Sequence, residues 1–137
     1  MLQIKKRKDG QVKMRFMSTI CLYQDSRHEA DLRWIRQVLK IGYLSRRHDG
    51  ISELRINGFT QTKQILEQLM PYVRFKRHQA KALYGAVKLL EGKTIRNLTK
   101  RDKQRLIRSI ITIQEHNYVT KRKRSESELR ELLGLTP

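Results

Sequence analysis

The chain has 137 residues, which suits one domain with a single core. Its 31 Lys and Arg residues against 13 Asp and Glu give a formal net charge of +18, which opposes compaction unless an anionic partner neutralises it. There is no apolar run of the roughly 20 residues that a membrane span needs and no signal peptide at Met1, and the single cysteine excludes an internal disulfide. We therefore expect an intracellular protein, in the cytoplasm or an organelle, that binds nucleic acid and not a membrane.

The first 24 residues predict a β-hairpin that turns at Asp9-Gly10, a strong signal for a two-residue turn. Apolar side chains alternate with basic ones in both strands, so one face should be core and the other basic. Cys21 lies in an apolar part of the return strand, and we expect its thiol to be buried in the core.

A helix and a second hairpin follow. Ser26 with Glu29 matches a capping box, and Gly42 provides a stop after a run of apolar residues at helical spacing. The next segment alternates again and should turn at residues 48–50, His-Asp-Gly.

Helices are expected over the rest of the chain, because apolar residues recur there at spacings of three and four. A capping box also precedes the last of them. Their start and stop signals are Thr60, Pro71, Gly92, Thr99, Ser125 and Glu128.

The predicted order is ββα-ββα-ααα, an α+β fold in which two β-hairpins form one antiparallel sheet. Helices should cover one face and leave a charged face opposite, with extra helices at the C-terminal end. We expect a single domain over residues 1–137, with a core at 1–92 and a helical extension at 93–137.

The charged face predicts contact with duplex DNA, because a two-stranded ribbon fits the major groove and long polar side chains can pair with base edges. The competing interpretation is an ordinary solvated sheet face. The outward residues are Gln3, Lys5, Arg7, Lys13, Arg15, Ser45, Arg47, Glu53 and Arg55.

Signals for catalysis are weak in the sequence itself. The four histidines are scattered without metal-ligand spacing, and both Asp-Gly pairs are better explained as turns than as metal ligands. There is no glycine-rich phosphate loop, no nucleophile elbow and no HExxH helix. We identify no metal ligand.

A cluster of cations stands at the start of one expected helix. The stretch "FKRHQAKAL", residues 75–83, has three cations among its first four residues, where positive charge opposes the helix dipole. We expect these side chains to face an anion, and generic phosphate contacts would satisfy that expectation. The cations in and beside the stretch that could make them are Arg74, Lys76, Arg77 and Lys81.

Three stretches, "GYLSRR", "LMPYVRFKRHQAKAL" and "HNYVTKRKRSESELRELL", resemble the LAGLIDADG homing endonucleases, most closely the single-motif members that act as homodimers. The similarity covers essentially the whole chain. It implies an αββαββα fold whose two hairpins form a saddle in the DNA major groove, and site-specific binding of double-stranded DNA. In the intact family it also implies Mg²⁺-dependent cleavage of the DNA phosphodiester.

The resemblance assigns roles to individual residues. Gln24 matches a water-positioning glutamine, Lys76 matches a lysine that stabilises charge at the scissile phosphate, and His28 stands where a basic residue completes the pocket. Gln79 would support the helix start. The segment "TKRKRS", 120–125, resembles a loop that grips flanking DNA, although "KRKR" also fits a nuclear-import signal. The expected contacts there are Asn117, Thr120, Lys121, Lys123 and Arg124.

The family's first helix, which carries the LAGLIDADG motif and an acidic ligand for magnesium, has no counterpart in this sequence. We therefore expect the chain to bind duplex DNA without cleaving it. The inner sheet face should then be left partly uncovered and adhesive. The apolar side chains expected on that face are Leu2, Ile4, Met14 and Phe16.

Two other functions stay open at this point. An intron RNA-binding maturase could use the same fold, and a structural RNA-binding protein, such as a ribosome component, would need only the charge.

Overall fold

The computed structural model describes residues 1–9, 13–118 and 122–135. Two antiparallel hairpins form one four-stranded sheet in the order β1-β2-β4-β3. The expected turn at Asp9-Gly10 falls partly outside the described residues. The strands are β1 (Leu2–Lys6), β2 (Met14–Asp25), β3 (Tyr43–Arg46) and β4 (Ile51–Asn57).

Five α-helices and two short 3₁₀ turns complete the described structure, so the predicted α+β order ββα-ββα-ααα is confirmed. The division of the chain at residue 92 stays a prediction. None of the helices in the described segments is both long and apolar enough to cross a membrane. The helices are α1 (Glu29–Leu39), α2 (Phe59–Leu69), α3 (Arg77–Leu90), α4 (Lys100–Glu115) and α5 (Glu126–Leu132), with η1 (Ser26–His28) and η2 (Ile95–Asn97).

The predicted helix starts are confirmed at two positions and wrong at two. Thr99 and Ser125 both form reciprocal capping boxes. Ser26 does not cap α1, because η1 comes first and the Asp25 carboxylate accepts the Arg27 amide. Nor does Thr60 cap α2, since that helix begins earlier, after Gly58 at a φ of 96° that favours glycine.

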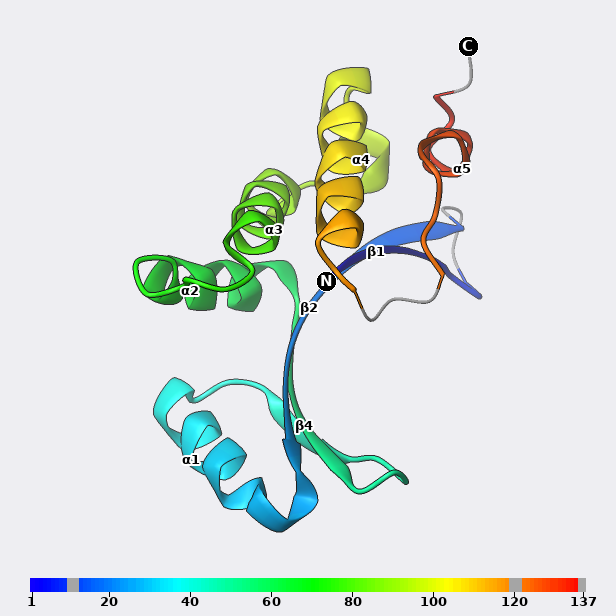
Figure 1. Ribbon diagram of the computed structural model, residues 1–137. Coiled ribbons are helices and arrows are strands. Elements are labelled where there is room, and N and C mark those ends of the chain that lie inside the picture. Colours follow the sequence, from blue (N-terminus) through cyan, green and yellow to red (C-terminus); the bar gives the residue numbers. More distant parts are fainter. Residues whose placement is uncertain (10–12, 119–121, 136–137) are drawn as a thin grey trace.

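Strand β2 is the longest of the sheet and pairs with two different strands. Its first part pairs with β1, where Ile4 lies opposite Phe16, and its second part pairs with β4, where Leu22 lies opposite Leu54. The β2–β4 ribbon therefore joins two ends of the molecule, with α1 at one end and α3, α4 and α5 at the other (Figure 1).

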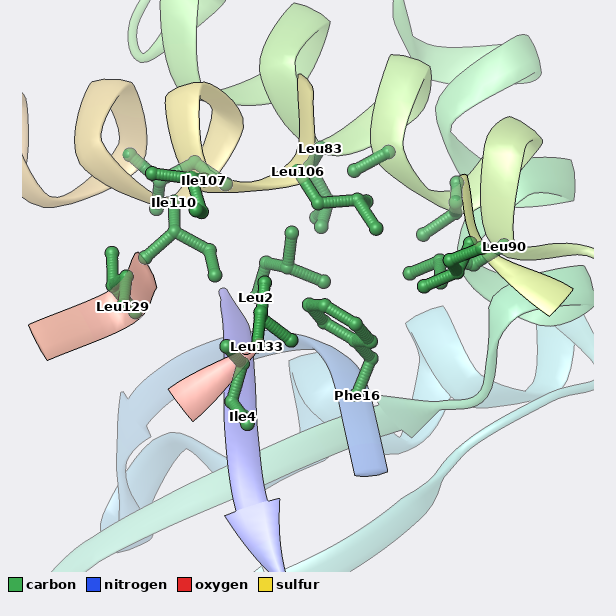
Figure 2. Close-up of a cluster of buried hydrophobic side chains, with 14 of the residues drawn as sticks. Leu2, Ile4, Phe16, Leu83, Leu90, Leu106, Ile107, Ile110, Leu129 and Leu133 are labelled. Carbon is green, nitrogen blue, oxygen red and sulfur yellow. The ribbon is translucent and has the colours of Figure 1, made fainter. Parts of the chain in front are cut away.

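The inner face at the β1 end is fully covered, so the expected adhesive surface there is wrong. Leu2, Ile4 and Phe16 are 3%, 2% and 7% exposed, and they belong to one buried cluster with residues of α3, α4 and α5. Figure 2 shows Leu2 and Phe16 pointing toward Leu106. The C-terminal helices fold back over this hairpin because burial of its aliphatic side chains stabilises the contact.

A buried carboxylate connects α1 to the inner face of the sheet at the β3 end. Glu29 of α1 is 5% exposed and accepts hydrogen bonds from Arg46 at 2.6 Å, from the Ser52 hydroxyl at 2.6 Å and from Arg33. The Arg46 guanidinium and the Ser52 hydroxyl lower the pKa of Glu29 to about 2. This network joins α1 to β3 and β4.

Candidate nucleic-acid interface

The outer face of the sheet carries the side chains that alternate away from the core. In the β1–β2 hairpin, Lys5 lies opposite Arg15 and Gln3 lies opposite Met17. A backbone hydrogen bond of 2.7 Å from Arg7 to Lys13 extends the hairpin, so these two cations flank the same ribbon. In the second half of the sheet, the expected outer residues share one face. Ser45 lies opposite Glu53, and Arg55 is two residues beyond Glu53 on β4.

Glu53 is the exception among the expected contacts, because its side chain is not open to solvent. It is 2% exposed, and its two oxygens accept hydrogen bonds from Arg55 Nε at 2.5 Å and from Arg47 Nη1 at 3.4 Å. Arg47 also donates to Asp49 at 2.7 Å. The Glu53 carboxylate therefore fixes the two guanidinium groups, and the pKa of Arg55 is raised chiefly by this hydrogen bond.

Aromatic side chains lie on the same face, and the sequence reasoning missed them. Tyr23 is 56% exposed and Tyr43 is 46% exposed, and Asn57 Nδ2 donates to the Tyr43 hydroxyl at 3.3 Å. Cys21, opposite Arg55, is half-buried on this outer face, so the expected core thiol is wrong. Cys21 and Tyr23 alternate in step with Arg15 along β2, so they point to the same face. The apolar residues around them in the sequence concealed this pattern.

The start of α3 is tied to the end of α4. Gln79 Nε2 donates to the His116 carbonyl at 2.6 Å, and the rings of His78 and His116 stack at 4.9 Å between centroids. Two histidines that seemed scattered in the sequence therefore meet. Lys76 adopts a left-handed φ of 56° just before the helix, and its side chain is exposed.

The three expected pocket residues have separate local surroundings, and their grouping into one site stays a prediction. Gln24 Oε1 accepts the Asp25 amide at 3.0 Å, and His28 is exposed a few residues later. Burial lowers the pKa of the Met1 ammonium to about 6. Cys21 acts to raise this pKa, and the positive charge of Lys76 acts to lower it. Lys76 thus lies by the start of β1.

Gln24 lies further along β2 than the residue that pairs with Met1. The Met1 carbonyl accepts the Thr19 amide at 2.9 Å, so the start of β1 lies beside Thr19. Gln24 is five residues further along the strand, which corresponds to about 17 Å. No hydrogen bond or ion pair joins Lys76 to Gln24 or His28 within the described residues, and their shared catalytic role stays a prediction.

Two of the expected C-terminal contacts, Asn117 and Arg124, lie beside β1. Arg124 Nη1 donates to the Ile4 carbonyl at 2.9 Å, and its backbone carbonyl and amide both bond to the Gln114 side chain at 3.0 Å. Arg124 therefore covers the free edge of the sheet. Asn117 lines a small cavity of about 180 Å³ together with Gln3. Lys123 is exposed, whereas the expected contacts Thr120 and Lys121 lie outside the described residues.

The described residues do not fit the magnesium site that the resemblance implies. Across residues 1–9, 13–118 and 122–135, no three His, Cys, Asp or Glu side chains gather to share a metal ion. Asp25 accepts two hydrogen bonds from the Arg27 guanidinium, while Glu29 and Glu53 are each held by two arginines. We derive no hydrolytic step from these residues.

Comparison with known proteins identifies relatives of this fold. No family model matches the sequence. The DNA endonuclease I-CvuI of Chlorella vulgaris is 33% identical over 88 residues, which are 64% of this chain and 55% of that protein. The aligned segment therefore spans only about half of this relative.

Solved structures agree with this match over nearly the whole chain. I-CvuI in complex with the I-CreI target and Mg²⁺, with the DNA not cleaved, superposes with a TM-score of 0.76 at 26% identity over 97% of this chain and 82% of that one. It has also been solved with its own target in the presence of Ca²⁺.

A more distant structure extends the comparison to the fold. The archaeal intron-encoded homing endonuclease I-Vdi141I, complexed with DNA, gives a TM-score of 0.80 at 14% identity and covers 97% of this chain and 84% of its own. The sheet order, the position of the helices and these matches lead to one conclusion: the chain has the fold of the LAGLIDADG homing endonucleases and is similar in sequence to I-CvuI.

Proposed function

We propose that this chain is a site-specific double-stranded DNA-binding domain of the homing endonuclease type, and that the outer face of its sheet contacts the major groove. The observation that carries the proposal is the arrangement of Arg47 and Arg55 around the buried Glu53 carboxylate. Two partly exposed guanidinium groups are thereby held in fixed positions on a face that also carries basic, polar and aromatic side chains.

Fixed guanidinium groups suit base readout. Arginine pairs bidentately with guanine in the major groove, and such a pair contributes about 1–3 kcal/mol of discrimination against a wrong base. Lys5 and Arg15, cross-strand neighbours at the other end of the sheet, are suited to phosphates, which set the register of the protein on the duplex. Tyr23, opposite Glu53, and Tyr43, opposite Arg55, add apolar contact area beside the arginines.

The relatives support the same partner. I-CvuI and I-Vdi141I were each solved in complex with DNA, and we transfer that partner to this chain. We also propose a homodimer, in which two copies would each read one half of a two-fold symmetric site. A DNA partner implies action inside the cell, in the cytoplasm or an organelle.

Strand cleavage stays outside this proposal, because the carboxylates of Asp25, Glu29 and Glu53 are engaged by arginines. I-CvuI was solved with Mg²⁺ and with Ca²⁺, so a divalent ion belongs to the chemistry of that relative. We assign Gln24, His28 and Lys76 to the DNA backbone, where they would contact phosphate oxygens as hydrogen-bond donors.

The test replaces the two fixed guanidinium groups in the full chain. A preferred duplex is first selected from a randomised library, and its affinity is then compared with that of an unrelated duplex at one stated salt concentration. The double variant Arg47→Gln/Arg55→Gln should lose about 10- to 100-fold in affinity for the preferred duplex and much less for the unrelated one. Loss of discrimination is thus the expected signature.

A matched control removes the same charge elsewhere. Lys40 and Lys100 are exposed, and Lys40→Gln/Lys100→Gln should leave discrimination intact. Equal weakening on both duplexes in the arginine variant would contradict the proposal, because it would show that these side chains contact only phosphates. Stronger competition by structured RNA than by duplex DNA would instead favour the maturase alternative, which the comparisons do not favour.

A further inference from the structure

A second basic surface lies on α4, and the sheet interface does not include it. Arg101, Arg105 and Arg108 recur at spacings of four and three residues, so they stand on one side of the helix. All three are exposed, and within the described chain no hydrogen bond or ion pair engages their guanidinium groups. We call these three residues the α4 arginine row. Their spacing corresponds to rises of about 6 Å and about 4.5 Å along the helix.

This row points away from the sheet. The opposite side of α4 carries Leu106 and Ile110, which are buried in the cluster that contains Leu2 and Phe16. Figure 2 shows that these α4 side chains face the β1 strand. Since α4 covers the inner face of the sheet, its arginine row and the outer face of the sheet lie on opposite sides of the molecule. One straight duplex on the sheet cannot contact both.

A groove between α3 and α4 adjoins the row. Its volume is about 290 Å³, and Lys81 on α3 faces Arg105 and Arg108 across it. Gly85 also lines this groove in the interior of α3, where a glycine lowers helix stability. An added Cβ at Gly85 would meet no atom within 4 Å, so neither a turn nor close packing requires the glycine. Its absent side chain leaves the groove open to a ligand.

The lining of the groove specifies the kind of ligand. Its polar groups are cations from two helices together with Ser109, whose hydroxyl already donates to the Arg105 carbonyl at 3.1 Å. Among the described residues, no aromatic side chain lines the groove, so unpaired bases have nothing to stack on. That part of the chain also offers no free hydroxyl in the groove to read a 2′-hydroxyl of RNA. Phosphate oxygens of a double helix are the anions that remain.

We propose that the α4 arginine row and the α3–α4 groove form a second DNA-binding surface, which holds the phosphate backbone of another double-stranded DNA segment. One protein would then bridge two duplex segments, one on the sheet and one on the helices. The second contact is independent of sequence, because only phosphates meet these side chains.

The experiment is a capture assay with the full chain. Protein is loaded on an immobilised duplex that carries the preferred site, excess protein is washed away, and a labelled duplex of unrelated sequence is added. Wild-type protein should capture the labelled duplex. Arg105→Gln/Arg108→Gln should capture at least tenfold less while its loading on the immobilised duplex stays within twofold of wild type.

Two further variants separate charge, shape and unspecific effects. Gly85→Gln fills the groove without changing its charge, and it should also reduce capture. Lys40→Gln/Lys100→Gln removes two exposed cations that do not line the groove, one after α1 and one at the first residue of α4, and should capture as wild type does. Undiminished capture by Arg105→Gln/Arg108→Gln would overturn the proposal.

The assay also distinguishes this proposal from the sheet interface. If the protein does not load on the immobilised duplex, the proposed function of the sheet is wrong. Binding to the second surface is then measured directly with the unrelated duplex. The arginine variant must weaken that binding at least tenfold for the second surface to stand. A labelled DNA that is displaced more readily by duplex RNA than by duplex DNA of the same length would show that the assigned partner is wrong.

Discussion

The two ends of the sheet are stabilised by different interactions. At the β1 end, α3, α4 and α5 cover the inner face with aliphatic side chains such as Leu106, which is fully buried. At the β3 end, Leu32, Leu54 and Ile56 are buried as well, and Glu29 of α1 adds ion pairs with two arginines. The outer face there is similar, because Glu53 is buried beneath Arg47 and Arg55.

This difference shows how the proposed DNA contacts acquire fixed positions. Apolar burial is non-directional and stabilises the β1 end without orienting any polar group. A buried carboxylate requires partners in defined geometry, so it also fixes the side chains that neutralise it. The readout arginines therefore lie at the polar end, and the aliphatic end supplies most of the stability.

The largest expected effect comes from breaking the aliphatic end. Leu106→Ala removes a fully buried side chain from the cluster under β1 and should lower the free energy of unfolding by about 3 kcal/mol. Urea unfolding at neutral pH measures this change. Val38 on α1 is 58% exposed, and Val38→Ala should change the free energy by less than about 0.5 kcal/mol. Comparable losses in both variants would remove the contrast between the two ends.

The second effect comes from the polar end and depends on pH. The pKa of Glu29 in the folded protein is about 2, below its ordinary value of 4.5, because the Arg46 guanidinium and the Ser52 hydroxyl favour the carboxylate. A lowered pKa contributes stability that is present above 4.5 and is lost as the pH falls toward 2. The urea midpoint of the wild type should therefore fall between about pH 5 and about pH 2.5.

Comparison with Glu29→Gln isolates this carboxylate from the others. The variant should be less stable than the wild type at pH 6, and the difference should shrink toward pH 2.5. Its loss at neutral pH should be smaller than that of Leu106→Ala, because Arg33 and Arg46 are largely exposed and regain water. A gap between variant and wild type that does not change with pH would show that Glu29 is not held as a carboxylate.

The smallest effect concerns the start of α4. The Thr99 hydroxyl accepts the Asp102 amide at 3.1 Å and the Asp102 carboxylate accepts the Thr99 amide at 3.1 Å, so Thr99→Ala should lower the free energy of unfolding by about 1 kcal/mol. Ser109→Ala removes a hydroxyl from the interior of the same helix and should cause no loss, since alanine has the higher helix propensity. Equal unfolding midpoints for Thr99→Ala and wild type would show that the cap contributes no stability to the helices at the β1 end.

Several local features follow from the sequence because they depend on neighbouring residues. The alternation of apolar and basic residues around Lys5 and Arg15 gives both faces of the first hairpin, and Ser125 with Glu128 gives the start of α5. Failures occurred where a local rule competed with tertiary contacts. Cys21 looked apolar in its run of residues, yet the register of β2 against β4 places it on the outer face.

The sequence by itself determined the class of fold, the basic face and the expectation of an anionic partner, since periodicity and net charge are properties of the linear chain. Tertiary structure alone decided which charges are free. Glu53 is buried beneath two arginines, Arg124 is bound to the edge of β1, and the α4 arginine row has no ion-pair partner among the described residues. The physical reason is that the burial of a side chain and the groups around it are set by the register of the strands and the packing of the helices, which no local pattern in the sequence contains.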